Sequence, residues 1–139
     1  MKTITFIGNG NMAFSIAEGL KNDYRIYVVG RDLSKLDEFE KKLGVKINKY
    51  LLEGFYIEDK TLLLCVKPAN VEEVGKLLKG KAKVVYSVLA GTSVEKLRSN
   101  INANAVVRTM PNLAASVKKS MTTLTGDVSF KEEAEELLG

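Results

Sequence analysis

The chain has 139 residues, of which 45% are hydrophobic and 27% charged, and these values fit a single globular domain. It contains no histidine and one cysteine, Cys65, which excludes a histidine general base, a Ser-His-Asp triad, a histidine zinc ligand and an internal disulfide. The net charge of +4 comes from lysines scattered among acidic residues, and no stretch interleaves basic with aromatic residues, so we expect no nucleic-acid partner.

No apolar run approaches the about 20 residues that a membrane-spanning helix needs, so no membrane partner is expected either. Residues 1–7 lead directly into a glycine turn and lack the apolar region and the cleavage site of a signal peptide, which predicts a strand there. A cytoplasmic location is the expected one, and the single cysteine agrees with a reducing compartment.

Segments rich in β-branched and apolar residues alternate with segments whose apolar residues recur at helical spacing. Asp32 or Ser34 is expected to cap the start of the second helix, and Gly44 to end it. In chain order, the expected elements are strand Thr3–Ile7, helix Met12–Lys21, strand Tyr24–Val29, helix Leu33–Leu43, strand Val45–Asn48, a weak helical turn at Tyr50–Gly54, strand Thr61–Val66, helix Val71–Leu78, strand Lys83–Val88, helix Val94–Asn100, strand Ala105–Thr109, strand Met121–Thr125 and helix Lys131–Leu138.

This alternation predicts βαβ units, and therefore an α/β fold: a doubly wound, mostly parallel Rossmann-type sheet with helices on both faces. The segment from Gly8 to Ala13 matches the pattern G-x-G-x-x-A between the first strand and the first helix. Gly8 would permit the tight turn, Gly10 would let the backbone approach a pyrophosphate, and Ala13 would keep the helix close to the sheet. The pattern predicts a dinucleotide site, although glycine turns also join strands to helices without any ligand.

The end of the second strand bears on the choice of cofactor. Domains specific for NAD usually place an acid there, but Gly30 occupies that position and Arg31 follows it. Arg31 can bind a 2′-phosphate through two charge-assisted hydrogen bonds, and Lys35 can add a second positive charge. NADP(H) is therefore predicted over NAD(H), unless the carboxylate of Asp32 points at the ribose.

Four motifs in this order carry a resemblance to a known family. They are Gly8-Asn9-Gly10-Asn11-Met12-Ala13, Val66-Lys67-Pro68, Ser87-Val88-Leu89-Ala90-Gly91 and Arg108-Thr109-Met110-Pro111-Asn112. Each lies at or beyond the carboxyl end of a predicted strand, where ligands bind in such sheets. Over essentially the whole chain, the sequence resembles the pyrroline-5-carboxylate reductase family. It departs from the family pattern at Cys65, Leu89, Leu113-Ala114 and Ser120, and near Tyr50 and Leu51, where an asparagine is often found.

The resemblance implies reduction of 1-pyrroline-5-carboxylate to proline, with NADPH as hydride donor and a small-molecule imine as substrate. It implies no metal and assigns no catalytic acid, which agrees with the lack of histidine because a protonated imine is already electrophilic. Met110, Pro111 and Asn112 are the candidates on the substrate side. The candidate cofactor-binding residues are Ile7, Gly8, Asn9, Gly10, Asn11, Met12, Arg31, Lys35, Cys65, Val66, Lys67, Pro68, Leu89, Ala90 and Gly91.

Members of this family are roughly twice as long, and a second, helical domain forms their dimer and holds the substrate carboxylate. The resemblance thus implies that residues 1–139 are the dinucleotide-binding domain of a homo-oligomeric parent, and that this piece alone is inactive. Two alternatives stay open. One is another NADP oxidoreductase with the same first domain, such as a deazaflavin-dependent NADP reductase or a hydroxyacid dehydrogenase. The other is a non-catalytic NADP-binding module.

Overall fold

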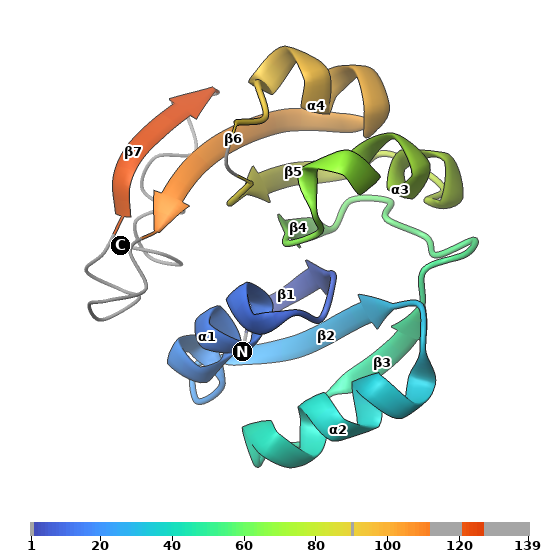
Figure 1. Ribbon diagram of the computed structural model, residues 1–139, viewed down its shortest axis with the longest axis vertical. Coiled ribbons are helices and arrows are strands. Elements are labelled where there is room, and N and C mark those ends of the chain that lie inside the picture. The colour runs from blue at the N-terminus through green and yellow to red at the C-terminus, as the bar shows by residue number, and fades with distance from the viewer. Residues whose placement is uncertain (1, 90, 112–120, 127–139) are drawn as a thin grey trace.

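A computed structural model describes residues 2–89, 91–111 and 121–126, with residues 109–111 and 121–126 described by their backbone alone. A seven-stranded sheet runs through the centre in the order β3-β2-β1-β4-β5-β6-β7 (Figure 1). Its strands are β1 (Lys2–Ile7), β2 (Tyr24–Gly30), β3 (Asn48–Leu51), β4 (Thr61–Leu64), β5 (Ala82–Ser87), β6 (Ala103–Pro111) and β7 (Met121–Gly126). The helices are α1 (Asn11–Leu20), α2 (Leu33–Leu43), α3 (Val71–Leu77) and α4 (Val94–Asn100), with a 3-10 turn η1 (Pro68–Asn70) before α3.

The strand order reverses between β1 and β4. β1, β2 and β3 proceed outward to one edge, whereas β4, β5 and β6 proceed to the other, and all six are parallel. Among the described strands, only β7 is antiparallel, paired with β6. The predicted doubly wound, mostly parallel sheet is therefore confirmed. Because Ile7 is level with Leu64, the carboxyl ends of β1 and β4 lie side by side at the reversal, which is where open α/β sheets bind ligands.

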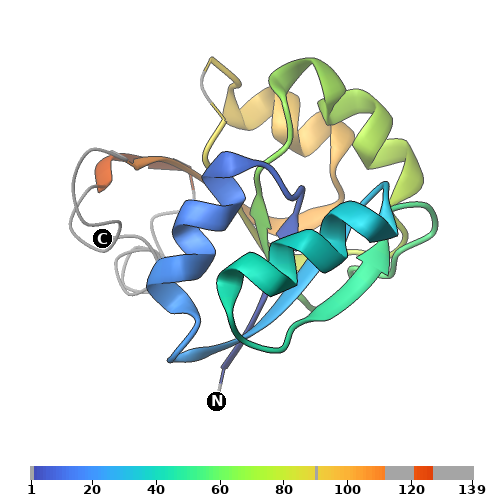
Figure 2. The ribbon, with the colours of Figure 1, turned by 60° about the horizontal axis from the view of Figure 1, so that its bottom comes forward.

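Helices cover both faces of this sheet (Figure 2). Side chains from α1 and α2 pack on one face with Ile4 and Phe6 of β1. The rings of Phe14 in α1 and Phe39 in α2 pack edge to face, with their centroids 5.3 Å apart. Side chains from α3 and α4 pack on the other face with Ile7 and Leu64. Since β4 contributes buried side chains to both layers, its sequence is a continuous apolar run rather than an alternating one.

The third strand is where the sequence-based expectation was wrong. β3 covers Asn48–Leu51 rather than Val45–Asn48, and the helical turn expected at Tyr50–Gly54 is absent because Tyr50 pairs with Val29 of β2. The residues before β3 are held by α2 instead, since the N–H of Ile47 donates to Oε2 of Glu40 at 2.8 Å. β3 is an edge strand with mostly exposed side chains, so it lacks the apolar pattern that marks a strand.

The remaining elements agree with the predicted ones to within a few residues. Asp32 caps α2, and Gly44 ends it in the left-handed conformation with φ 78°. β4 stops at Leu64, and β6 is longer than expected, running from Ala103 to Pro111. The helix expected at Lys131–Leu138 lies outside the described residues.

The carboxylate of Glu40 ties α2 to the segment that enters β3, and its contribution to stability should depend on pH. It accepts hydrogen bonds from the N–H of Ile47 and from Nζ of Lys49, and these lower the pKa of Glu40. Because the pKa of Glu40 is lower in the folded chain than in the unfolded chain, its carboxylate stabilises the fold at any pH above its pKa in the unfolded chain. This stabilisation is lost as the pH falls through its pKa in the folded chain.

Glu40→Gln is expected to lower the Tm by about 2–4 °C at neutral pH, and the difference from wild type should vanish as the pH falls below about 4. Thermal unfolding followed by circular dichroism across that pH range checks this. Glu38→Gln, at an exposed position of the same helix, makes the same charge change and serves as control. A Glu40→Gln deficit that stays constant down to acidic pH would contradict the role given to this carboxylate.

Candidate functional site

A cleft of about 380 Å³ opens at the carboxyl ends of the strands, where the strand order reverses. Four chain segments meet there: the turn between β1 and α1, the turn between β2 and α2, the residue that follows β3, and the segment that follows β4. The residues that line it are Gly8, Asn9, Gly10, Val29, Gly30, Arg31, Asp32, Lys35, Leu52, Cys65, Val66, Lys67 and Asn70.

Gly8 makes the tight turn at the floor of this cleft. Its φ of 108° lies in the range that favours glycine, and a Cβ there would sit 2.8 Å from the carbonyl oxygen of Cys65. The N–H of Gly8 donates to the carbonyl of Val29 at 2.9 Å, and the N–H of Cys65 donates to the carbonyl of Ile7 at 2.8 Å. The turn is therefore fastened to the strands on either side of β1.

Gly10 is a glycine for a different reason. Its φ of −81° and ψ of −169° suit any residue, and a Cβ built there meets no protein atom within 4 Å. Neither backbone conformation nor packing requires glycine at this position. What glycine leaves is open space beside the first turn of α1, which lets a ligand approach the backbone closely.

The amino-terminal end of α1 differs from those of α2 and α4. Asp32 accepts a hydrogen bond from the N–H of Ser34, and Ser93 accepts one from the N–H of Lys96, so each of those helices has a side-chain cap. In the described part of the chain, no side chain caps α1. Free N–H groups and the positive end of the helix dipole therefore face the cleft at Gly10, an arrangement that favours an anion.

A side chain at position 30, at the end of β2, would have to displace two neighbouring side chains. A Cβ on Gly30 would lie 2.9 Å from Oδ1 of Asn9 and 3.1 Å from Cδ2 of Leu36. Asp32, the nearest carboxylate along the chain, is engaged in capping α2: its Oδ1 accepts from the N–H and from the hydroxyl of Ser34, which lowers the pKa of Asp32. The cleft here offers the cations Arg31 and Lys35 instead.

An ion pair spans two elements at this cleft. Nη1 of Arg31, just after β2, donates to Oε1 of Glu73, in the first turn of α3, at 2.8 Å. The hydrogen bond and the opposite charge raise the pKa of Arg31 and lower that of Glu73. The side chains are 50% and 58% exposed respectively, so the guanidinium remains accessible to solvent.

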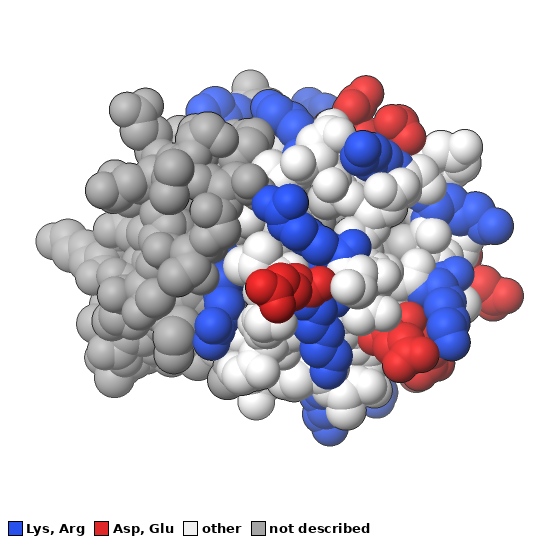
Figure 3. Space-filling model, turned by 90° about the horizontal axis from the view of Figure 1, so that it is seen from above, with Lys and Arg blue, Asp and Glu red and all other residues white. Residues whose placement is uncertain are grey.

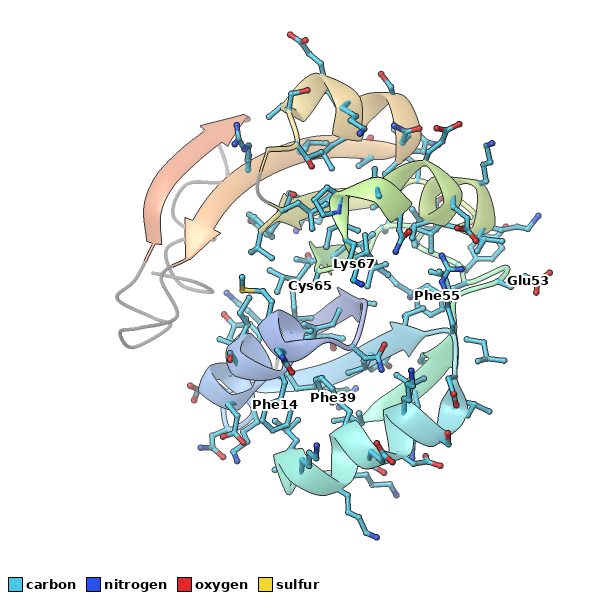
Figure 4. All side chains as sticks on the ribbon, in the orientation of Figure 1. Phe14, Phe39, Glu53, Phe55, Cys65 and Lys67 are labelled. Atoms are coloured by element: carbon cyan, nitrogen blue, oxygen red, sulfur yellow. The ribbon has the colours of Figure 1, made fainter. Side chains whose placement is uncertain are left out.

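Cys65, Val66 and Lys67 form the wall contributed by the segment after β4. Figure 4 shows Cys65 and Lys67 between the start of α1 and α3. Cys65 packs against the core beneath α1, and burial raises the pKa of its thiol, so it is a small apolar side chain and not a reactive thiolate at neutral pH. Lys67 is exposed and lies just before η1, where it adds a third cation to the cleft.

The cleft brings together much of the predicted cofactor set. Asn11 lies beside it, in a hollow of about 330 Å³ shared with Lys35. Pro68 is exposed at the start of η1 and does not line the cleft. The predicted residues that do line it are Gly8, Asn9, Gly10, Arg31, Lys35, Cys65, Val66 and Lys67.

Other predicted residues lie deeper or away from the cleft. Ile7 is fully buried below it, and Met12 packs against the core under α1. Leu89, a candidate cofactor-binding residue, is only 5% exposed and packs in the core, so its side chain is not part of an open surface. Gly91 adopts a φ of 68° after it.

Part of the predicted site falls where little or nothing is described. Met110 and Pro111 end β6, at the same edge of the sheet as the cleft, and only their backbone is described. Ala90 and Asn112 lie outside the described residues. Arg108, the first residue of the fourth motif, has its Nε buried with no hydrogen-bond partner in the part of the chain that the structure describes.

Three lining residues, Val29, Leu52 and Asn70, were not considered as site residues from the sequence. Leu52 follows β3 and donates its N–H to the carbonyl of Gly30 at 2.9 Å, directly after Tyr50 and Leu51, near which the family resemblance leads one to expect an asparagine. Only the correct position of β3 would have revealed it. Asn70 ends η1, three residues after Lys67, and its proximity to the Val-Lys-Pro motif was the signal that could have found it.

The described residues show neither a membrane-crossing helix nor a metal cluster. None of their helices is long and apolar enough to pass through a bilayer. Nor do three or more of their Cys, Asp or Glu side chains gather as possible ligands of a metal ion. On the face shown in Figure 3, basic side chains are interspersed with acidic ones rather than gathered in one patch.

Comparison with known proteins gives consistent matches. Residues 3–91 match the profile of the family described as "NADP oxidoreductase coenzyme F420-dependent". The chain is 34% identical over 130 residues to a pyrroline-5-carboxylate reductase of Helicobacter pylori, covering 89% of this chain and 49% of that one. It is 35% identical over 142 residues to the same enzyme of Pasteurella multocida, covering 95% and 52% respectively.

Among solved structures, 1-pyrroline-5-carboxylate reductase of Streptococcus pyogenes superposes with a TM-score of 0.73 at 26% sequence identity, over 96% of this chain and 52% of that one. The resemblance inferred from the four motifs is thereby confirmed. The chain spans about half the length of these relatives. Family and fold together are those of oxidoreductases that bind a nicotinamide dinucleotide.

Proposed function

Because this chain belongs to the family described as "NADP oxidoreductase coenzyme F420-dependent", we propose that it is the NADP(H)-binding half of a pyrroline-5-carboxylate reductase. The observation that carries the proposal is the open, uncapped amino-terminal end of α1 at Gly10, flanked by Arg31, Lys35 and Lys67 in one cleft. The relatives named above support the choice of reaction. The whole protein would then catalyse the last step of proline synthesis, in the cytoplasm.

The residues of the cleft suit this cofactor. The N–H groups at the start of α1 and the open space at Gly10 would hold the pyrophosphate. Arg31 and Lys35 would bind the 2′-phosphate, because position 30 carries a glycine and not an acid, and Asp32 is engaged by Ser34. The segment Val66-Lys67 would lie along the ribose. When bound, NADPH supplies the hydride that reduces a C=N bond.

The protein would then have to orient the cofactor and the substrate and to exclude water from the place where they react. A protonated imine is already electrophilic, so the chain needs no acid at the reacting atom, in agreement with its lack of histidine. We propose that Met110, Pro111 and Asn112 lie on the substrate side, because β6 ends at the same edge of the sheet as β1 and β4. Asn112 can both donate and accept a hydrogen bond to the substrate or the carboxamide.

Arg31→Ala should reduce the preference for NADPH over NADH by about tenfold, since it removes charge-assisted hydrogen bonds that only the 2′-phosphate can accept. Calorimetric titration of the wild type and the variant with both cofactors measures the ratio. Arg25→Ala, at the exposed opposite end of β2, removes the same charge away from the cleft and should leave the ratio unchanged. If the wild type binds NADPH and NADH equally well, the 2′-phosphate argument is wrong.

We further propose that residues 1–139 form one dinucleotide-binding domain, and that a helical domain follows it in a homo-oligomeric parent protein. The parent should oxidise NADPH in the presence of pyrroline-5-carboxylate, whereas residues 1–139 alone should not. The length of the reading frame tests the first statement, and an absorbance assay of both proteins tests the second. An active 139-residue chain would show that no further domain is needed.

The description of the matching family points to a second candidate, a reductase that exchanges hydride between NADP and a deazaflavin. Assaying the parent protein with reduced coenzyme F420 and NADP, beside the pyrroline assay, separates the two. Activity with the deazaflavin alone would favour this second function. The relatives in Helicobacter and Pasteurella favour the first.

A further inference from the structure

The ion pair links Arg31, which lines the candidate cofactor cleft, to Glu73 in the first turn of α3, three residues beyond Asn70 of the cleft wall. Arg31 and Glu73 are 42 positions apart in the chain, and packing of α3 beside the end of β2 brings them to 2.8 Å. Both side chains are about half exposed, and such pairs contribute little to stability. We therefore look for a role of this ion pair in ligand binding rather than in stability.

We propose that Glu73 competes with the 2′-phosphate of NADP(H) for the guanidinium of Arg31, and thereby limits the preference of this chain for NADP(H). The inference rests on the proposed function, in which Arg31 binds that phosphate. It adds a residue that lies on α3, outside every motif considered so far. Glu73 thus acts as a specificity-determining residue through Arg31 and not by touching the reacting atoms.

The contact geometry supports competition. The guanidinium presents its N–H groups as a planar fork, and a phosphate is bound best when two of them point at it. Glu73 already occupies Nη1. A phosphate that takes Nη1 and Nη2 must share Nη1 with the carboxylate or displace it, whereas a phosphate that takes Nε and Nη2 leaves the Glu73 contact in place. In both arrangements the two anions contact one guanidinium and repel each other.

The other charged residues near Arg31 do not compete for its guanidinium as Glu73 does. Asp32 also lines the cleft, but its Oδ1 is engaged by Ser34 at the start of α2. Lys35 and Lys67 are cations and attract the phosphate. The neighbour of Glu73, Glu72, pairs with Lys76 on its own helix at 3.5 Å. Among these carboxylates, Glu73 is the one that forms a hydrogen bond with Arg31.

The test compares Glu73→Gln with Glu72→Gln, which makes the same change one residue away and leaves the Arg31 contact intact. Calorimetry with the 139-residue chain measures binding of NADPH and of NADH. Glu73→Gln should bind NADPH about three- to fivefold more tightly than wild type and NADH within about twofold. Glu72→Gln should match wild type for both, and the gain of Glu73→Gln should shrink in high salt.

A double variant tests whether Arg31 mediates the effect. In an Arg31→Ala background, Glu73→Gln should bring no gain, and an undiminished gain would show that Glu73 acts without Arg31. Weaker or unchanged NADPH binding by Glu73→Gln, in a chain that binds NADPH, would overturn this inference alone. If the wild type binds neither cofactor, the proposed function fails and this inference fails with it.

Discussion

Gly10→Val is expected to weaken NADPH binding at least about 100-fold while the fold remains intact. The valine side chain would occupy the space beside the first turn of α1, where no protein atom lies within 4 Å of the place that a Cβ would take. A pyrophosphate kept away from that turn loses at least two charge-assisted hydrogen bonds to N–H groups, which accounts for the size of the loss. The backbone of Gly10 is extended, so valine fits it without strain.

Fluorescence or calorimetric titration with NADPH measures the binding loss, and thermal unfolding measures the stability of the variant. Gly10→Ser is a second variant that separates binding from stability, because serine is a favourable residue at a helix N-cap. It should raise or preserve the Tm and yet weaken binding, though less than valine does. Full NADPH affinity in Gly10→Val would show that the phosphates do not lie at this turn.

Gly75→Ala is expected to destabilise the fold by about 3 kcal/mol, near the upper end for an overpacked site. Alanine in the interior of a helix is ordinarily more favourable than glycine by about 0.5–1 kcal/mol. Here the sign reverses, because a Cβ on Gly75 in α3 would collide with the carbonyl group of Asn100 at the end of α4. Backbone atoms cannot move aside as a flexible side chain can, so the two helices would have to separate.

Chemical denaturation of Gly75→Ala and wild type measures the difference in the free energy of unfolding. Gly44→Ala is the matched control: a Cβ there has open space around it, and only the left-handed φ of 78° opposes the change. It should cost about 1 kcal/mol. If Gly75→Ala proved as stable as wild type, α3 and α4 would be farther apart than the structure places them.

Some features of the candidate site could be predicted from local sequence alone. The glycines at positions 8 and 10 follow an apolar strand and precede a helix, and the physical demands on that turn are satisfied within a few residues. Arg31 follows Gly30 directly, so its place at the end of β2 was also predictable. β3 was misplaced because an exposed edge strand carries little of the apolar pattern that defines a strand.

The amino-acid sequence by itself determined the alternation of strands and helices, and hence the doubly wound class of the fold and the end of the sheet at which the cleft opens. Periodicity and glycine conformation are properties of neighbouring residues, so local sequence encodes them. Only the tertiary structure decided which distant groups meet. Asn9 lies over Gly30, Leu52 enters the cleft, and Glu73 reaches Arg31. These contacts depend on how separate βα units pack on one another, and no local pattern encodes that.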